Sequence, residues 1–250
     1  DVDECADNLH YCDASALNCT NTIGSYSCVC NQTYAPYYGD EGKKYINVSG
    51  FDASTILGND SRYLENLRSF LEPVINSSVR NRFVRCWHAK EDGWAASTFH
   101  GNCDDKGPTV TIIQVGSFIF GGYIDVSWES PLPGHYRIGY SSEAFIYSLT
   151  NNKGSGPHAV YNPVKLRVKL DKYCRYFAAV SSASYGPRFG WSDIVISNNA
   201  TSNQDSYTYC GGYYPLPPGY SLYGRFKCTF YAGSYNFTPT DIEVFCETTT

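Results

Sequence analysis

The sequence predicts a mainly β protein of the α+β class, in which a small disulfide-rich module precedes an antiparallel β-sandwich decorated with helices. Three observations support this fold class. Five cysteines fall within the first thirty of the 250 residues. Aromatic residues make up 16% of the chain, and this bias favours strands. From residue 83 onwards, short apolar runs are bounded by Gly, Pro, Asn or Ser, which is typical of strands and turns.

The chain divides into three predicted parts. Residues 1–45 contain few aliphatic side chains, so we expect cross-links rather than a core to hold them together. Residues 46–60 are polar and are predicted to be a linker. The sandwich domain is expected over residues 61–247.

A helix is predicted at the start of the large domain, within residues 61–78. Apolar residues recur there at helical spacing, including Leu64, Leu67 and Leu71. Asp60 or Ser61 can cap its start, and Pro73 is expected to kink or end it. Shorter helices are predicted at 95–103 and 141–151.

Short strands are predicted through the rest of the domain, and many of them alternate apolar and polar residues. Gly186 and Gly190 predict a turn within residues 185–190. Gly121 and Gly122 are expected to let neighbouring elements approach closely. The predicted strands are 83–89, 109–115, 118–128, 135–140, 159–164, 165–170, 175–182, 193–197 and 242–245.

Charge and hydropathy argue against two classes of partner. The net charge is −5 and no run of Lys and Arg exceeds two residues, so we expect no nucleic acid partner. The most apolar segment, residues 110–126, contains Gln114 and Asp125, so we expect no direct membrane insertion. The chain begins at the first residue of a motif, and we expect it to be a processed product or an excerpt.

Cysteines and glycosylation motifs agree on the compartment. Eleven cysteines favour an oxidising environment, and Asn-x-Ser/Thr motifs predict N-linked glycans. We therefore expect a secreted or extracellular protein, at the cell surface or in the matrix. Cys19 occupies the middle of the first motif. The acceptor asparagines are Asn31, Asn47, Asn59, Asn76, Asn199, Asn236 and Asn18.

The first thirty residues resemble a calcium-binding EGF-like module. The resemblance rests on the acidic "DVDEC" and on the spacing C-x-N-x4-Y-x-C that begins at Cys19. It implies disulfides Cys5–Cys19 and Cys12–Cys28. It also implies calcium as cofactor, held by Asp1, Val2, Glu4, Asn21, Thr22 and Ser25.

The chemistry of these positions suits calcium, a hard cation that takes six to eight oxygen ligands. Asp1 and Glu4 offer carboxylates, and Asn21 offers an amide oxygen. Val2, Thr22 and Ser25 would contribute backbone carbonyls, and Gly24 permits the turn that brings two of these inward.

The sixth cysteine of the EGF pattern is absent, which leaves the partner of Cys30 open. After the two implied bridges, seven cysteines remain: Cys30, Cys86, Cys103, Cys174, Cys210, Cys228 and Cys246. An odd number leaves one unpaired within the chain. If it is Cys103, then Cys30 bonds to the sandwich. If it is Cys30, that residue is a candidate link to another chain.

The remainder of the sequence resembles the TLDc domain, in order, across roughly residues 55–246. The segments that carry the resemblance include "DGWAASTFHGNCDDKGPTVTII", "FGGYIDVSW" and "YGPRFGWSDIVIS". It implies two antiparallel sheets packed face to face, with helices around them. Cytosolic members are tied to oxidative-stress protection and to V-type proton pumps, which a secreted, glycosylated chain could not reach.

No residue pattern predicts catalysis, and we expect a protein that is not an enzyme. The histidines are His10, His88, His100, His135 and His158, and they show no zinc-binding spacing. Asp104 and Asp105 are expected to lie in a solvated turn. Nothing in the sequence indicates a lowered pKa for Cys103, as a catalytic thiol would need.

The leading hypothesis is a non-enzymatic structural or interaction protein. It would be a glycosylated subunit of an extracellular matrix, cell-surface or filament assembly, with a calcium-stiffened EGF-like joint. Its partners would be other copies of itself or other extracellular proteins. The alternative is a receptor-type ectodomain that binds a carbohydrate or protein ligand, and the third is a secreted redox protein.

Overall fold

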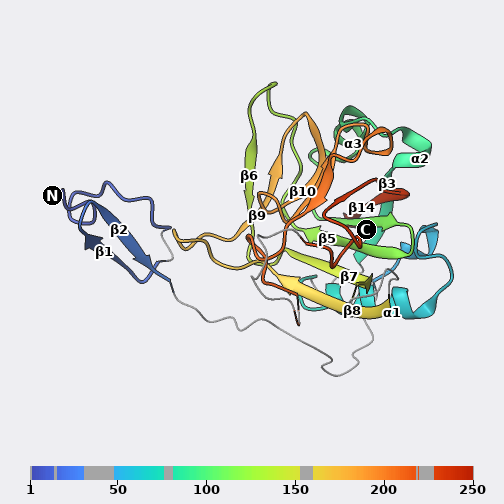
Figure 1. Cartoon of the computed structure of the whole chain (residues 1–250), viewed down its shortest axis with the longest axis horizontal. Coiled ribbons are helices and arrows are strands. Elements are labelled where there is room, and N and C mark those ends of the chain that lie inside the picture. Colours follow the sequence, from blue (N-terminus) through green and yellow to red (C-terminus); the bar gives the residue numbers. More distant parts are fainter. Residues whose placement is uncertain are drawn as a thin grey trace.

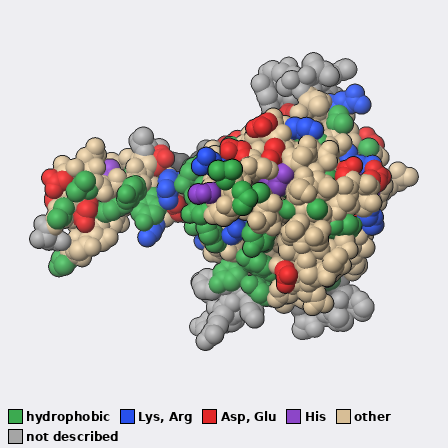
Figure 2. Space-filling view, turned by 90° about the horizontal axis from the view of Figure 1, so that it is seen from above, with side chains coloured by type: hydrophobic (Ala, Val, Ile, Leu, Met, Phe, Trp, Pro, Cys, Tyr) green, Lys and Arg blue, Asp and Glu red, His purple; other side chains and the backbone are tan. Residues whose placement is uncertain are grey.

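The computed structural model describes residues 2–13, 16–30, 48–75, 81–152, 160–217, 219 and 228–249. The EGF-like part projects from one side of a larger domain, and the N-terminus lies at its far end (Figure 1). In the space-filling view it forms a narrower body beside the rounded large domain (Figure 2). The mainly β fold class is confirmed.

Two six-stranded sheets form the large domain, and all their neighbouring strands are antiparallel. The long sheet has the order β3-β14-β4-β5-β7-β8. Its strands are β3 (Asn81–His88), β4 (Thr109–Val115), β5 (Phe118–Ile124), β7 (Phe145–Asn151), β8 (Val160–Arg167) and β14 (Asp241–Thr249). The last strand of the chain thus pairs with the first strand of the domain, which closes the fold.

The short sheet has the order β13-β12-β11-β10-β9-β6. Its strands span two to five residues. They are β6 (Arg137–Tyr140), β9 (Phe177–Ser181), β10 (Tyr185–Phe189), β11 (Ile194–Ser197), β12 (Ser206–Thr208) and β13 (Asn236–Phe237).

The core has two layers, one on each face of the long sheet. Between the sheets lie Phe120, Trp128 and Phe189. The other face is covered by α1 (Ser61–Leu71), whose Leu67 and Leu71 are fully buried. Helices α2 (Ala89–Asp92) and α3 (Ala96–Cys103) follow β3, and short 3-10 turns η1 (Phe51–Ala53) and η2 (Ala200–Ser202) complete the elements.

The predicted helix at residue 61 is present but shorter than the sequence pattern suggested. The side chain of Asp60 accepts a hydrogen bond from the backbone N–H of Arg62, which caps the first turn. The helix ends at Leu71, two residues before Pro73, because proline has no backbone N–H with which to continue the helical hydrogen bonds. Residues 76–78 of the prediction lie outside the described residues. The predicted helix 95–103 is α3.

Two local predictions were wrong. Residues 141–151 form a turn and β7 instead of a helix, because every side chain of β7 is buried and its apolar run carries no helical period. Residues 185–190 were predicted as a turn, but Tyr185–Phe189 form β10 and only Gly190 follows in the turn.

The segment predicted as a linker, residues 46–60, packs into the large domain wherever it is described. Val48, Phe51 and Leu57 are buried against the long sheet. The carboxylate of Glu243 on β14 accepts hydrogen bonds from the hydroxyl of Ser54 and the backbone N–H of Thr55. Ser54 and Thr55 therefore bind a buried carboxylate, while Asp52 and Asn59 face solvent. Residues 46–47 lie outside the described residues.

Candidate calcium site and the junction of the two modules

The EGF-like part is a hairpin held by two disulfides. Strands β1 (Asn18–Thr22) and β2 (Ser25–Val29) pair antiparallel, with Thr22 opposite Ser25. Gly24 has φ 74°, which the tight turn requires. The bridges are Cys5–Cys19 and Cys12–Cys28, the pairing that the resemblance implies.

Glu4 carries the feature that best fits a cation. Its Oε2 is shielded from solvent, yet it accepts no hydrogen bond from any described residue. A buried carboxylate oxygen without a partner is costly, and a bound divalent cation would compensate for it. The neighbouring Asp3 is already used, since its Oδ1 accepts hydrogen bonds from the backbone N–H groups of Cys5 and Ala6.

The Cys5–Cys19 bridge brings the other predicted ligands near Glu4. Cys5 directly follows Glu4 and is bonded to Cys19. Cys19 and Asn21 are two residues apart on β1, so their side chains point to the same side of the strand. Thr22 and Ser25 flank the turn with their side chains exposed, and Val2 is exposed as well. Asp1 lies outside the described residues. Bound calcium would tie the N-terminal segment to this hairpin.

We expect calcium to bind weakly, at about 10⁻⁴–10⁻³ M, as in other extracellular modules. The Glu4→Gln substitution should weaken binding at least tenfold, measured by isothermal titration calorimetry on the full chain. Asp7→Asn removes a nearby exposed carboxylate outside the predicted ligand set and should change binding little. Equal effects of both substitutions would contradict the predicted ligand set.

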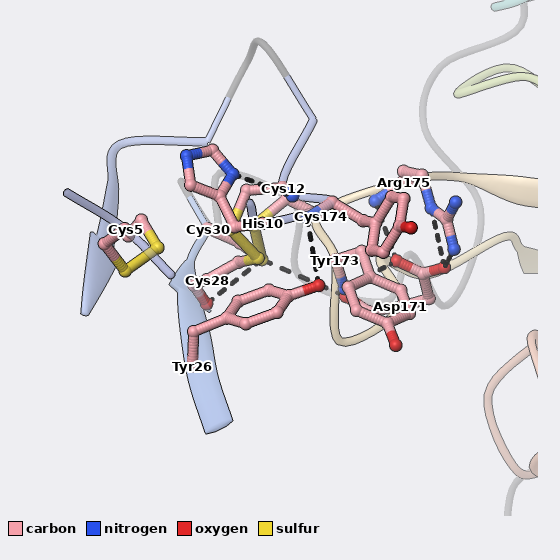
Figure 3. Close-up of a disulfide and its surroundings, with 12 residues drawn as sticks. Cys5, His10, Cys12, Tyr26, Cys28, Cys30, Asp171, Tyr173, Cys174 and Arg175 are labelled. Atoms are coloured by element: carbon pink, nitrogen blue, oxygen red, sulfur yellow. Dashed lines mark hydrogen bonds and ion pairs between the residues drawn. A yellow bond between two sulfur atoms is a disulfide. The ribbon is translucent and has the colours of Figure 1, made fainter. Parts of the chain in front are cut away.

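Cys30 is bonded to Cys174 of the large domain, so the missing EGF bridge is replaced by one between modules. Cys174 lies in the connection between β8 and β9, which reaches toward the hairpin (Figure 3). Asp171 shapes this connection, because its carboxylate accepts the backbone N–H groups of Tyr173 and Arg175 and pairs with the Arg175 guanidinium. The backbone N–H of Asp13 donates to the Tyr173 carbonyl at 3.0 Å.

The remaining cysteines follow the first of the two predicted arrangements. Cys86–Cys246 joins β3 to β14, Cys210–Cys228 links two buried positions between β12 and β13, and Cys103 is free and buried. The odd cysteine count predicted one free thiol. It could not identify Cys174 as the partner of Cys30, because only the tertiary fold brings them together.

Cys103 is placed as a structural thiol. Its sulfur lies 3.6 Å from that of Cys86, and all three sulfurs, with Cys246, lie within 4.8 Å of one another. For thiol–disulfide exchange, the Cys103 sulfur would have to lie in line with the Cys86–Cys246 bond, which would place it about 5.6 Å from the Cys246 sulfur. The observed separation is shorter, so the thiol is not aligned for exchange. Burial also raises the pKa of the Cys103 thiol, which keeps it protonated.

The two buried histidines of the large domain, His88 and His100, have structural partners, while His135 is exposed. His100 is buried in α3, with Nδ1 2.7 Å from the Asp104 carboxylate and Nε2 3.0 Å from the carbonyls of Ser182 and Tyr185. Asp104 also accepts a hydrogen bond from Ser130, so its oxygens are already used. His88 contacts Asp241 at 3.1 Å. His158 lies outside the described residues.

Within the described ranges, two places bring three metal-ligating atoms close together. One contains His10, Cys12 and Cys19, and the other contains Cys86, Cys103 and Cys246. Each includes disulfide-bonded sulfurs, which cannot serve as thiolate ligands. Neither place is a candidate zinc site.

Sequence reasoning missed several buried charged groups, among them Glu243, Lys165 and Asp193. Glu243 is fully buried and pairs with Arg85, while Lys165 is buried beneath α1. Asp193 accepts hydrogen bonds from the backbone N–H groups of Tyr213 and Tyr214, and burial raises the pKa of its carboxyl to about 7. A charge inside an otherwise apolar strand run, as in "IEVF", was the available signal.

Four glycosylation motifs lie on described residues, and their asparagines are exposed. These are Asn18, Asn59, Asn199 and Asn236. Asn31, Asn47 and Asn76 lie outside the described residues. Cys19, in the middle of the first motif, is bonded to Cys5.

Comparison with known families agrees with this geometry. The model of the calcium-binding EGF domain matches residues 1–44, which implies calcium binding, and the model of the TLDc domain matches residues 50–247. None of the curated proteins matches the chain. Because the TLDc match covers well over half of the sequence, this chain belongs to the TLDc domain family.

Proposed function

We propose that this chain is a non-enzymatic, secreted structural or interaction protein. It would be a glycosylated subunit of an extracellular matrix, cell-surface or filament assembly that contains further copies of itself or other extracellular proteins. The single observation that carries the proposal is the Cys30–Cys174 bridge, which joins an EGF-like module covalently to a TLDc domain. Such a bridge persists in oxidising compartments and not in the cytosol.

The bridge limits movement on one side of the EGF-like module. Cys30 ends the described part of the module, and the Asp13–Tyr173 hydrogen bond adds a second contact at the same junction. The proposed calcium ligand Glu4 belongs to the N-terminal segment, which begins at the end of the module far from this junction (Figure 1). Calcium would therefore stiffen the N-terminal end of the EGF-like module, where a neighbouring domain or subunit would attach. The Cys30–Cys174 disulfide holds the other end against the large domain.

The environment of the candidate groups supports a non-catalytic role. Cys103 and His100 are buried within the fold. Calcium bound at the hairpin would stabilise the protein by only about 0.4–1.4 kcal/mol at about 1 mM calcium. This free energy is enough to stiffen the N-terminal segment of the EGF-like module but too small to hold the large domain folded. No helix among the described residues is long and apolar enough to cross a bilayer.

Immunogold electron microscopy on cells that make the protein tests this proposal. Label should lie outside the plasma membrane on matrix, surface coat or filaments, and calcium chelation should loosen the labelled assembly. The protein extracted from it should carry N-linked glycans and run as a monomer on non-reducing gels, because Cys30 is bonded within the chain. Label confined to the cytosol would overturn the proposal.

A further inference from the structure

The outer face of the short sheet carries a cluster of partly exposed aromatic rings. The ring of Trp191 packs against Tyr136 at 5.1 Å and against Phe177 at 6.2 Å, measured between ring centroids. Phe177 is buried, while the four rings that we call the aromatic face keep 36–50% of their surface exposed. These four are Tyr136, Tyr140, Tyr185 and Trp191.

Arg188 lies between two of these rings. Its guanidinium carbon is 4.8 Å from the Trp191 ring centroid and 5.4 Å from that of Tyr185. Its Nε donates a hydrogen bond to the Trp191 carbonyl at 2.7 Å, which fixes the plane of the group. The guanidinium is thus held in place by the backbone and by both rings, with little freedom left to lose on binding.

The charge of Arg188 is not compensated within the described part of the chain. No described carboxylate lies within ion-pair distance of it, and no described acceptor binds its two terminal nitrogens. The neighbouring arginines differ, because Arg137 pairs with Glu129 and Arg175 pairs with Asp171. In a chain of net charge −5, Arg188 therefore offers an anion a fixed, two-pronged donor.

We propose that the aromatic face and Arg188 bind an acidic polysaccharide, one whose sugar rings carry carboxylate or sulfate groups. The apolar face of a sugar ring can stack on Trp191 or Tyr185 while its anionic group bonds to the guanidinium. Several rings beside a single unpaired cation match a polymer with about one charge per sugar ring. An acidic peptide would instead call for several free cations close together. Hydrophobic and basic side chains gather on the large domain beside the EGF-like part (Figure 2).

Binding of defined polymers to the full glycosylated chain tests the proposal. The probes are polygalacturonate for carboxylates, dextran sulfate for sulfates and neutral dextran as the uncharged control. Isothermal titration should detect at least one of the two acidic polymers and not dextran, and the acidic polymer that binds identifies the anionic group. Binding should weaken as salt increases.

Matched variants locate the site. Arg188→Gln and Trp191→Ala should each weaken binding roughly tenfold, the size expected for one charge-assisted contact or one stacked ring. Arg82→Gln removes an arginine that is more exposed than Arg188 and contacts none of the four rings, so it should change binding less than twofold. Arg188→Lys keeps the charge but loses the two-pronged geometry, so it should bind only partly as well as the native chain.

Several results would overturn the proposal. These are absence of binding to both acidic polymers, equal binding of neutral dextran, or equal losses from Arg82→Gln and Arg188→Gln. Displacement of the polymer by polyglutamate at equal charge would indicate a protein partner instead. Because Trp191→Ala could disturb the cluster, its thermal unfolding is compared with that of the native chain, and Arg188→Gln alone still decides the outcome.

Discussion

The Gly122→Ala substitution should lower the free energy of unfolding by about 2–3 kcal/mol, because it overpacks a filled core. Gly122 lies in β5 of the long sheet, where a Cβ would stand 2.4 Å from Cε1 of Phe189. Phe189 belongs to β10 of the short sheet and is fully buried. Its ring already packs edge-on against Trp128 at 5.7 Å, so it cannot retreat. The added methyl group would press the two sheets apart.

Urea unfolding of the oxidised chain, followed by tryptophan fluorescence, measures this loss. Gly101→Ala is the matched control, because a Cβ there meets nothing within 4 Å and alanine is favoured over glycine in a helix by about 1 kcal/mol. In a double-mutant cycle, Gly122→Ala should lower the free energy of unfolding by less in a Phe189→Leu background than in the native chain. If Gly122→Ala has the same free energy of unfolding as the native chain, then Phe189 has room to move and the expectation is wrong.

The sequence predicted elements whose pattern is local. The β4–β5 hairpin was expected as two strands around a turn, and it spans Thr109–Val115 and Phe118–Ile124. The EGF-like spacing implied both hairpin bridges, and Asp60 was predicted as one of two possible caps for α1. In each case residues within about twenty positions determine the geometry, so one sequence contains the necessary information.

The remaining features depend on contacts between distant residues. β7 is buried on both faces because α1 covers the side that the other sheet does not, and this removed the alternation that would have identified a strand. Residues 46–60 were predicted as a linker because they are polar, but Ser54 and Thr55 bind Glu243, which is 188 residues from Thr55. The Cys30–Cys174 pair and the aromatic face around Arg188 could not be predicted, because they depend on where the fold places the β8–β9 connection and the β10–β11 turn.

The buried Lys165 should make stability rise with pH above neutrality. Its ammonium group lies 4.2 Å from the Phe145 ring centroid and donates a hydrogen bond to the Phe70 carbonyl near the end of α1. Burial, aided by nearby Arg167, lowers the pKa of Lys165 to about 7. In the unfolded chain this pKa is about 10.4. Between these values the unfolded chain binds a proton that the native chain does not, so raising the pH favours the native state.

The native chain should therefore gain about 2–3 kcal/mol relative to Lys165→Met between pH 6 and pH 9, since one proton is linked to unfolding over most of that range. Below about pH 6 both states are protonated and the difference should stay constant. Urea titrations at several pH values measure it, with Lys106→Met as control because that lysine is exposed. Parallel pH profiles for the native chain and Lys165→Met would show that the ammonium keeps its charge beneath α1. The carbonyl of Phe70 and the face of the Phe145 ring would then have to replace its lost hydration.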